Sequence, residues 1–509
     1  MNKKINKLVS LGLTGVMALS MAACGGEGGA NPPAAGNEGN SGDSGNGGAA
    51  AVAANTEYTT DTHRDLVIGS WWRMYYASGD VMEDSPDWVT AQFADDDSDA
   101  LREEKTFNQD LAVRKMDTVK KIEEKYNCSF TWTNLTYDGT AESLQTSTLA
   151  GTPDADVYMV ATSMAVPAQA NGLLLDLHTV LPADHDLFTD QKYMTYLDMG
   201  DGKASILWYQ GGFKNTYPLA FNVQMLEEEG LEDPRDLYAR GEWTWDKFRE
   251  YCEALTQDTD GDGQTDQYGF CGFANDTFNQ LLMSNGAAVA GGTTETLSSA
   301  ATGECLQFLS DMYNTWKVCY PYEYFKDGAN PSDSMRIQYN NGNIAFFPIA
   351  VWIQNANGNY PNGEQGNLTW DTAYVQWPVG PSGNQDTNAT INSVDGNWFV
   401  IPVNVEQPAL VANFLYDLNS WWEGMDENPM NDRKANNWWY NETAKVPELN
   451  DANFEVQQYC LAHPGMELWE SLNVEGLSLE DIIDGTMTPA QFQETYKQPV
   501  QDALDAMFK

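Results

Sequence analysis

The sequence predicts an α/β protein with more than one domain. Short apolar segments typical of strands alternate with segments of helical periodicity, which is the pattern of a mostly parallel sheet with helices on both faces. The first strands are expected at Leu66–Ser70, Cys128–Leu135, Asp156–Ala161 and Gly172–Leu177, and a helix at about Asn108–Tyr126 separates the first two. About 450 residues follow the N-terminal segment, which is enough for two or three domains.

Residues 1–23 have the features of a signal peptide, because basic residues precede a short apolar run at Leu8–Met21. The small residues before Cys24 resemble a bacterial lipobox, which predicts that Cys24 becomes the lipidated first residue of the mature chain. The alternative is ordinary signal cleavage beside an incidental cysteine. Residues 24–60 consist mainly of Gly, Asn, Ala, Ser, Pro and acidic residues, so they are expected to form a flexible linker. The mature protein is therefore expected to be anchored to the membrane rather than to span it.

Composition limits the possible ligands and activities. A net charge of −47 with only 27 basic residues argues against nucleic acid and anionic ligands. The four histidines lie far apart and form no zinc-protease motif, and there is no Walker loop or serine-hydrolase elbow. With 74 acidic residues a carboxylate pair is always available, so a glycoside hydrolase remains an alternative.

A helix is expected directly after Thr244, whose hydroxyl suits the N-cap position. Its apolar residues at helical spacing predict one buried stripe, made of Trp245, Phe248, Cys252 and Leu255. Trp132, Trp243 and Trp316 are likewise assigned to packing. The end of this helix leads directly into an acidic loop.

The acidic loop has the spacing of an EF-hand loop, in which positions 1, 3, 5 and 9 carry side-chain ligands. These positions are occupied by Asp258, Asp260, Asp262 and Asp266. Gly263 stands at the turn position and the Gln264 carbonyl is the expected backbone ligand, so we expect a structural Ca²⁺. Gly269 occupies the place of the usual bidentate Glu, so either a distant acid completes the shell or the site is weak. The alternative is an exposed acidic turn without an ion.

The Trp245 helix, the acidic loop and the following Tyr268–Phe270 together resemble the extracellular solute-binding proteins of family 1 type, the lipoprotein components of bacterial ABC sugar importers. Four further segments match patterns of that family, covering about residues 64–425: Thr216–Leu231, Gly342–Trp352, Trp377–Gly383 and Gly396–Pro402. The resemblance implies a two-lobe, periplasmic-binding-protein-like (type II) fold with hinge crossings between the lobes. It also implies delivery of a solute to the permease subunits of an ABC transporter, from the outer face of the cell membrane.

The resemblance divides the chain into two lobes. The first lobe is expected to contain residues 61–218 with parts of 343–352 and 405–509. The second lobe is expected to contain residues 219–342, including the acidic loop, with part of 353–404. We expect a monomer.

The expected ligand is a neutral carbohydrate, in particular an oligosaccharide, because sugar rings have apolar faces that stack on aromatic rings. Aromatic residues at predicted strand ends or lobe crossings are candidates for stacking: Trp72, Trp208, Tyr209, Trp352 and Trp398. Trp352 is the best placed, because both its strand end and the family pattern indicate it. Candidate partners for sugar hydroxyls are Arg73, Ser163 and Asp395. The alternatives are that each tryptophan belongs to a core, or that the protein is a calcium-containing hydrolase or a polysaccharide-binding surface protein without transport.

Six cysteines follow Cys24: Cys128, Cys252, Cys271, Cys305, Cys319 and Cys460. Cys252 and Cys271 flank the acidic loop, so a disulfide between them is the first pairing to consider, with buried free thiols as the alternative. No Cys-x-x-Cys or Cys/His cluster indicates zinc.

Overall fold

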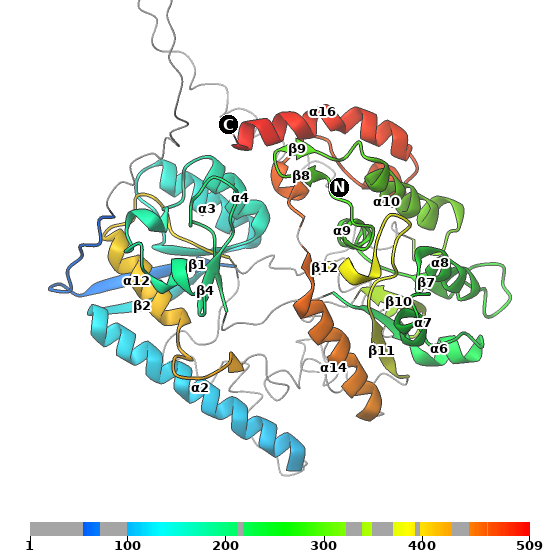
Figure 1. Cartoon of the computed structure of the whole chain (residues 1–509), viewed down its shortest axis with the longest axis horizontal. Helices are drawn as coiled ribbons and strands as arrows, with labels where there is room; N and C mark the ends of the chain where they lie inside the picture. The colour runs from blue at the N-terminus through cyan, green and yellow to red at the C-terminus, as the bar shows by residue number, and fades with distance from the viewer. Residues whose placement is uncertain are drawn as a thin grey trace, which may run out of the picture. The chain divides into compact units, whose positions relative to one another are not determined.

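The protein is described from a computed structural model (Figure 1). The structure describes residues 54–71, 99–210, 217–321, 338–339, 341–348, 370–391, 398–429, 447–465 and 467–508. The predicted signal peptide, Cys24, Trp72, Arg73, Trp352 and Asp395 lie outside these residues. Among the described residues, no helix combines the length and apolar character needed to cross a bilayer.

The first of two large sheets contains six strands in the order β2-β1-β3-β13-β5-β4. Their bounds are β1 Arg64–Ser70, β2 Cys128–Asn134, β3 Val157–Val160, β4 Met194–Tyr196, β5 Leu207–Tyr209 and β13 Trp398–Val400. Strand β1 is parallel to β2 and to β3, whereas β13 is antiparallel to β3 and pairs Trp398 with Val160. The sheet is therefore mixed, and not mostly parallel as the sequence predicted.

Helices cover both faces of the first sheet: α2 Asp99–Tyr126, α3 Tyr137–Leu149, α4 Thr162–Ala170, α5 Asp186–Thr189 and α12 Pro408–Asn419. Helix α12 packs beside α2, and the Tyr126 hydroxyl donates a hydrogen bond of 2.7 Å to Asp417 (Figure 1). Helix α2 begins nine residues before the predicted helix. The strand predicted at 172–177 is instead a single bridge between Leu174 and Pro402, followed by a 3₁₀ turn at Leu177–Thr179.

The second large sheet contains four strands in the order β11-β6-β10-β7, and β6 is antiparallel to its two neighbours. The bounds are β6 Leu219–Asn222, β7 Tyr268–Phe270, β10 Ile344–Pro348 and β11 Thr372–Val375. Strand β10 thus belongs to the second sheet and β13 to the first, and the predicted lobe boundaries stay a prediction.

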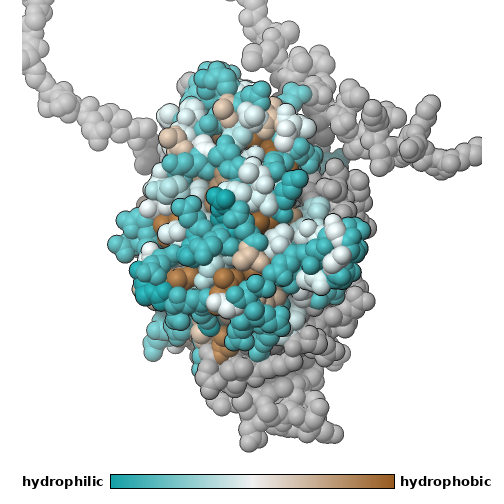
Figure 2. Space-filling model, turned by 90° about the vertical axis from the view of Figure 1, so that its right-hand side faces the viewer, coloured by the Kyte–Doolittle hydropathy of each residue, from teal (hydrophilic) through white to brown (hydrophobic). Residues whose placement is uncertain are grey.

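The helices around the second sheet are α6 Val223–Glu228, α7 Pro234–Ala239, α8 Trp245–Ala254, α9 Ala274–Ser284, α10 Ala300–Ser310, α14 Pro447–Ala462, α15 Glu480–Ile483 and α16 Pro489–Phe508. Two small ribbons are also present: β8 Ala290–Gly291 with β9 Thr294–Glu295, and β12 Thr390–Ile391 with β14 Pro464–Gly465. Most of the chain after residue 446 therefore packs with the second sheet. Figure 2 shows one face of the protein, on which hydrophilic residues predominate and apolar residues form small separate patches.

The predicted α8 helix and its buried stripe are confirmed. Thr244 accepts a hydrogen bond from the Lys247 amide, and Trp245, Phe248 and Cys252 are buried against the second sheet. All six cysteines that follow residue 24 are buried free thiols, so the Cys252–Cys271 disulfide is not formed. The two thiols lie in different core clusters, one with Phe248 and the other with Tyr374.

Candidate functional site

Polar and aromatic side chains gather where the parallel strands of the first sheet end. Strands β1, β2 and β3 run in the same direction, so their carboxyl ends lie at one edge of the sheet, where open α/β sheets bind ligands. Because β13 is antiparallel to β3, its first residue, Trp398, lies beside Val160 at the same edge. We call this edge the strand-end site of the first sheet.

A partly exposed aromatic pair and a hydroxyl group stand at the strand-end site. The ring centroids of Trp71, directly after β1, and Tyr137, which begins α3, lie 4.9 Å apart in an edge-to-face arrangement. The Tyr137 hydroxyl lies 3.4 Å from the Ser163 hydroxyl, and 44% of Tyr137 is exposed. The Thr136 hydroxyl caps α3 by accepting a 3.0 Å bond from the Gly139 amide, which fixes the backbone at Tyr137. The pair therefore offers an aromatic surface next to hydroxyl groups.

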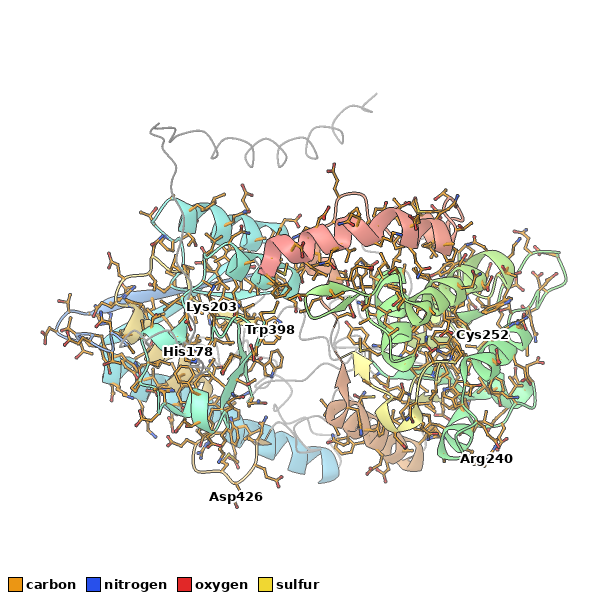
Figure 3. The ribbon with its side chains drawn as sticks, turned by 45° about the horizontal axis from the view of Figure 1, so that its top comes forward. His178, Lys203, Arg240, Cys252, Trp398 and Asp426 are labelled. Atoms are coloured by element: carbon orange, nitrogen blue, oxygen red, sulfur yellow. The ribbon has the colours of Figure 1, made fainter. Side chains whose placement is uncertain are left out.

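The three predicted aromatic contacts that the structure describes are buried. The exposed fractions of Trp208, Tyr209 and Trp398 are 5%, 3% and 4%. The Trp398 indole, labelled in Figure 3, donates a 2.8 Å hydrogen bond to the Thr162 hydroxyl. The Trp398 ring lies 5.8 Å from that of Trp208. In this conformation these three side chains belong to the core around the first sheet. Their direct contact with a ligand stays a prediction. Ser163 alone of the predicted polar partners is described, and it lies at the site.

Besides the strand-end site, a polar pocket that the sequence analysis missed lies near the carboxyl end of β7. It has a volume of about 270 Å³ and is lined by Asn275, Trp469, Glu470, Asn473, Val474, Leu477, Ser478 and Leu479. The two Glu470 oxygens accept hydrogen bonds of 2.8 Å from the Asn275 amide and 3.1 Å from the Asn279 amide. The fixed carboxylate can accept further bonds from hydroxyl groups. The sequence carried one weak signal for it, because Asn275 lies at the start of α9, five residues after the end of β7.

The acidic loop brings the four predicted carboxylates together. One oxygen from each of Asp258, Asp260, Asp262 and Asp266 lies within 4.8 Å of the others, which fits a cation with oxygen ligands. The hydrogen bonds from the Thr259 hydroxyl and amide hold the pKa of Asp266 below its ordinary value. The loop is closed by a bridge between Gln257 and Gln267.

The structure explains why glycine stands at loop position 12. A Cβ atom at Gly269 would lie 2.5 Å from both the Cα atom and the carbonyl oxygen of Cys252 in α8. No side chain fits there, so the bidentate glutamate of an EF-hand is excluded by the packing of β7 on α8. A Ca²⁺ ion at this loop would be held by the four aspartates and the Gln264 carbonyl, with the remaining positions open to water.

Residues 117–420 match the model of a family described as bacterial extracellular solute-binding protein. The chain belongs to this family. As a member, this solute-binding protein acts on the outer side of the cell membrane, and its family is one of binding proteins rather than enzymes. No protein with a curated function matches its sequence.

Three solved structures show which fold the solute-binding protein has. An ABC substrate-binding protein from Listeria monocytogenes in complex with cycloalternan has a TM-score of 0.54 at 17% identity, covering 88% of this chain and 98% of its own. The GacH receptor of Streptomyces glaucescens, studied unliganded and with acarbose, has a TM-score of 0.51 at 13% identity, covering 87% and 99%. UgpB from Mycobacterium tuberculosis with glycerophosphocholine has a TM-score of 0.50 at 17% identity, covering 78% and 94%. The similarity to these structures confirms the predicted two-lobe, type II fold, in which each large sheet forms the centre of one lobe.

Proposed function

We propose that this solute-binding protein captures a neutral oligosaccharide and delivers it to the permease subunits of an ABC transporter. The observation that carries the proposal is the strand-end site, where the Trp71–Tyr137 pair, with Tyr137 exposed, stands beside the Ser163 hydroxyl. An aromatic surface beside hydroxyl groups suits a sugar ring, whose apolar face needs a flat partner and whose hydroxyls need polar ones. Two of the similar structures hold oligosaccharide-type ligands, cycloalternan and acarbose, and a net charge of −47 disfavours an anionic ligand.

The polar pocket near β7 supplies complementary chemistry on the second lobe. Its Glu470 carboxylate, held by Asn275 and Asn279, suits a ligand rich in hydroxyl groups. A ligand that contacts both lobes binds the closed arrangement better than the open one and shifts the population towards it. Closure around the ligand then presents one conformation to the transporter.

Anchoring by a lipid on Cys24 completes the proposal. The lipobox-like sequence and the linker at 24–60 support a receptor attached to the outer face of the cell membrane, where it reaches its permease. We expect this receptor to be a monomer. Mass spectrometry of the membrane fraction tests this, because a diacylated Cys24 is expected as the first residue. Recovery of an unmodified chain from the medium alone would contradict it.

A thermal-shift panel of neutral oligosaccharides tests the ligand class. We expect one class to raise the melting temperature, and calorimetry on that ligand to show at least a tenfold loss of affinity in Tyr137→Ala. Tyr137→Phe keeps the ring and removes the hydroxyl next to Ser163, so its affinity should fall less. If Tyr137→Ala bound the ligand with unchanged affinity, the Tyr137 ring would not contact the ligand.

The same panel separates the alternative functions. The ligand should be recovered intact after incubation, whereas shortened chains would identify a hydrolase. Preference for long polysaccharides with weak, multivalent binding would indicate a surface protein without transport. No shift with any saccharide would contradict the proposal.

We also propose that the acidic loop binds a structural Ca²⁺. The gathered oxygens of Asp258, Asp260, Asp262 and Asp266 support it, because carboxylates this close repel one another unless a cation neutralises them. Calcium at a hundred times its dissociation constant would stabilise the fold by about 2.7 kcal/mol.

Calcium removal should therefore lower the melting temperature by several degrees. EDTA is expected to produce this loss, and added Ca²⁺ to restore it. Asp262→Asn keeps an acceptor for the Gln264 amide but removes a charge, so its response to Ca²⁺ should be weakened. The matched control is Asp110→Asn, at an exposed position of α2. An identical melting temperature with EDTA and with Ca²⁺ would contradict the site.

A further inference from the structure

A further cavity belongs to neither the strand-end site nor the acidic loop, and it is larger than the β7 pocket. It has a volume of about 790 Å³ and lies in the second lobe, between the start of α8, the helix α10 and the turn at Val379–Gly383. This volume is in the range of small-molecule sites. We call it the α8–α10 cavity.

Three aromatic side chains line the α8–α10 cavity. The ring of Phe308 lies 4.6 Å from that of Trp245 and 5.1 Å from that of Trp316. The Trp245 indole N–H is already bonded to the Ser284 hydroxyl at 3.2 Å, so this ring contributes only apolar surface. Trp245 and Phe308 are mainly buried at the base, whereas Trp316 is partly exposed.

Three carboxylates stand around these rings, from Asp246, Glu304 and Asp311. The Glu304 carboxylate is fixed in place, because its Oε2 atom accepts hydrogen bonds of 2.9 Å from the Asn285 amide and 2.7 Å from the Ser382 hydroxyl. A carboxylate held in this way needs little further ordering to bind a cation.

The basic residues near the cavity have partners elsewhere on α8. Lys247 pairs with Glu250 at 2.5 Å, and Arg249 pairs with Glu253 at 3.2 Å. The Arg249 guanidinium also lies 4.5 Å from the centre of the Trp316 ring, so this ring already stacks with a cation in the fold. The described lining of the cavity holds three carboxylates and no basic side chain, so its charge is negative.

We propose that the α8–α10 cavity binds an organic cation, a guanidinium or ammonium group on an apolar stem. The stem packs on the aromatic base, and the charged group pairs with Glu304 and its neighbours Asp246 and Asp311. The group can come from a free small molecule or from a basic side chain of a partner protein, and both present the same chemistry.

Calorimetry at low salt with three cationic probes tests the proposal and separates the sources. The probes are agmatine, N-acetylarginine amide and the blocked peptide acetyl-Leu-Arg-Leu-amide, and the uncharged control is N-acetylcitrulline amide. We expect at least one cationic probe to bind at least tenfold more tightly than the control. Tightest binding of agmatine indicates a free small molecule, and tightest binding of the blocked peptide indicates a protein side chain. Equal binding of charged and uncharged probes, or binding of none, would overturn the proposal.

Two variants assign the binding to the cavity. Glu304→Gln and Asp311→Asn each remove one negative charge, and each should lower the affinity for the cationic probes at least fivefold. Asp426→Asn removes an exposed charge outside the cavity (Figure 3) and should leave probe affinity unchanged. Oligosaccharide-induced melting shifts should persist in all three, so failure of this site is distinguishable from failure of the sugar site. Wild-type probe affinity in both cavity variants would place the binding elsewhere and overturn the proposal.

Discussion

Gly269→Ala is expected to destabilise the solute-binding protein by about 3 kcal/mol or more, at the upper end of the range for overpacked cores. The added methyl carbon would lie 2.5 Å from the backbone of Cys252, well inside van der Waals contact. Both partners are held, since Gly269 lies in β7 and Cys252 in α8, where its neighbours Phe248 and Phe270 are buried in one core cluster. The helix and the strand must therefore separate, which opens the packing on both sides. Chemical denaturation with the fluorescence of the buried tryptophans measures the loss.

Gly291→Ala is the matched control, because this glycine also lies in a strand. Its added carbon would meet the Thr296 side chain at 3.2 Å, and a side-chain methyl group can move aside. The control should change the unfolding free energy by less than about 1 kcal/mol. Equal stability of Gly269→Ala and the wild type would show that α8 and β7 are not packed this closely.

The α8 helix shows which features can be predicted from sequence. Its cap at Thr244 and its buried stripe depend on residues within one helix, and helical periodicity reports them directly. Gly269 shows which features the sequence alone does not explain. In the sequence it is only a departure from the EF-hand pattern, and the reason for it depends on how a strand packs against a helix that begins 24 residues earlier.

The candidate site was predicted less well, because its geometry depends on distant parts of the chain. The strand end placed Ser163 beside β3, but the sequence could not tell that Trp208 and Trp398 are buried in a core cluster with residues of α4. The Asn275–Glu470 pair joins residues 195 positions apart, so no local pattern reports it. The pairing of β13 with β3 could not be predicted for the same reason, since β3 lies far earlier in the chain.

A buried carboxyl group at Glu467 is expected to make the stability of the protein fall as the pH rises from about 4.5 to about 8. Burial, with a smaller contribution from the charge of Glu470, raises the pKa of Glu467 from its ordinary value of 4.5 to about 8, against the lowering effect of backbone N–H groups such as that of Val289. Its Oε1 atom accepts a 3.2 Å bond from the Val289 amide, whereas Oε2 is buried without a hydrogen-bond partner. A charge on this group is therefore poorly compensated in the fold.

The direction of the effect follows from proton linkage. Between pH 4.5 and pH 8 the folded protein keeps the Glu467 proton and the unfolded chain releases it, so unfolding becomes easier as the pH rises. Below this window the stabilising contribution is complete, and above it the contribution is lost. At about 1.4 kcal/mol for each pKa unit, the full effect is on the order of a few kcal/mol.

Glu467→Gln isolates this contribution, because the amide remains neutral at every pH and can still accept the bond from Val289. The difference in unfolding free energy between Glu467→Gln and the wild type should grow in favour of the variant from pH 5 to pH 8.5, by a few kcal/mol. Glu475→Gln, at an exposed position of the following loop, should show no such growth. The comparison with wild type at each pH removes the contribution of the other ionisable groups. If the difference in unfolding free energy between the variant and the wild type stayed constant across this range, Glu467 would be charged in the folded protein. Its Oε2 atom would then be stabilised by a hydrogen-bond donor such as water.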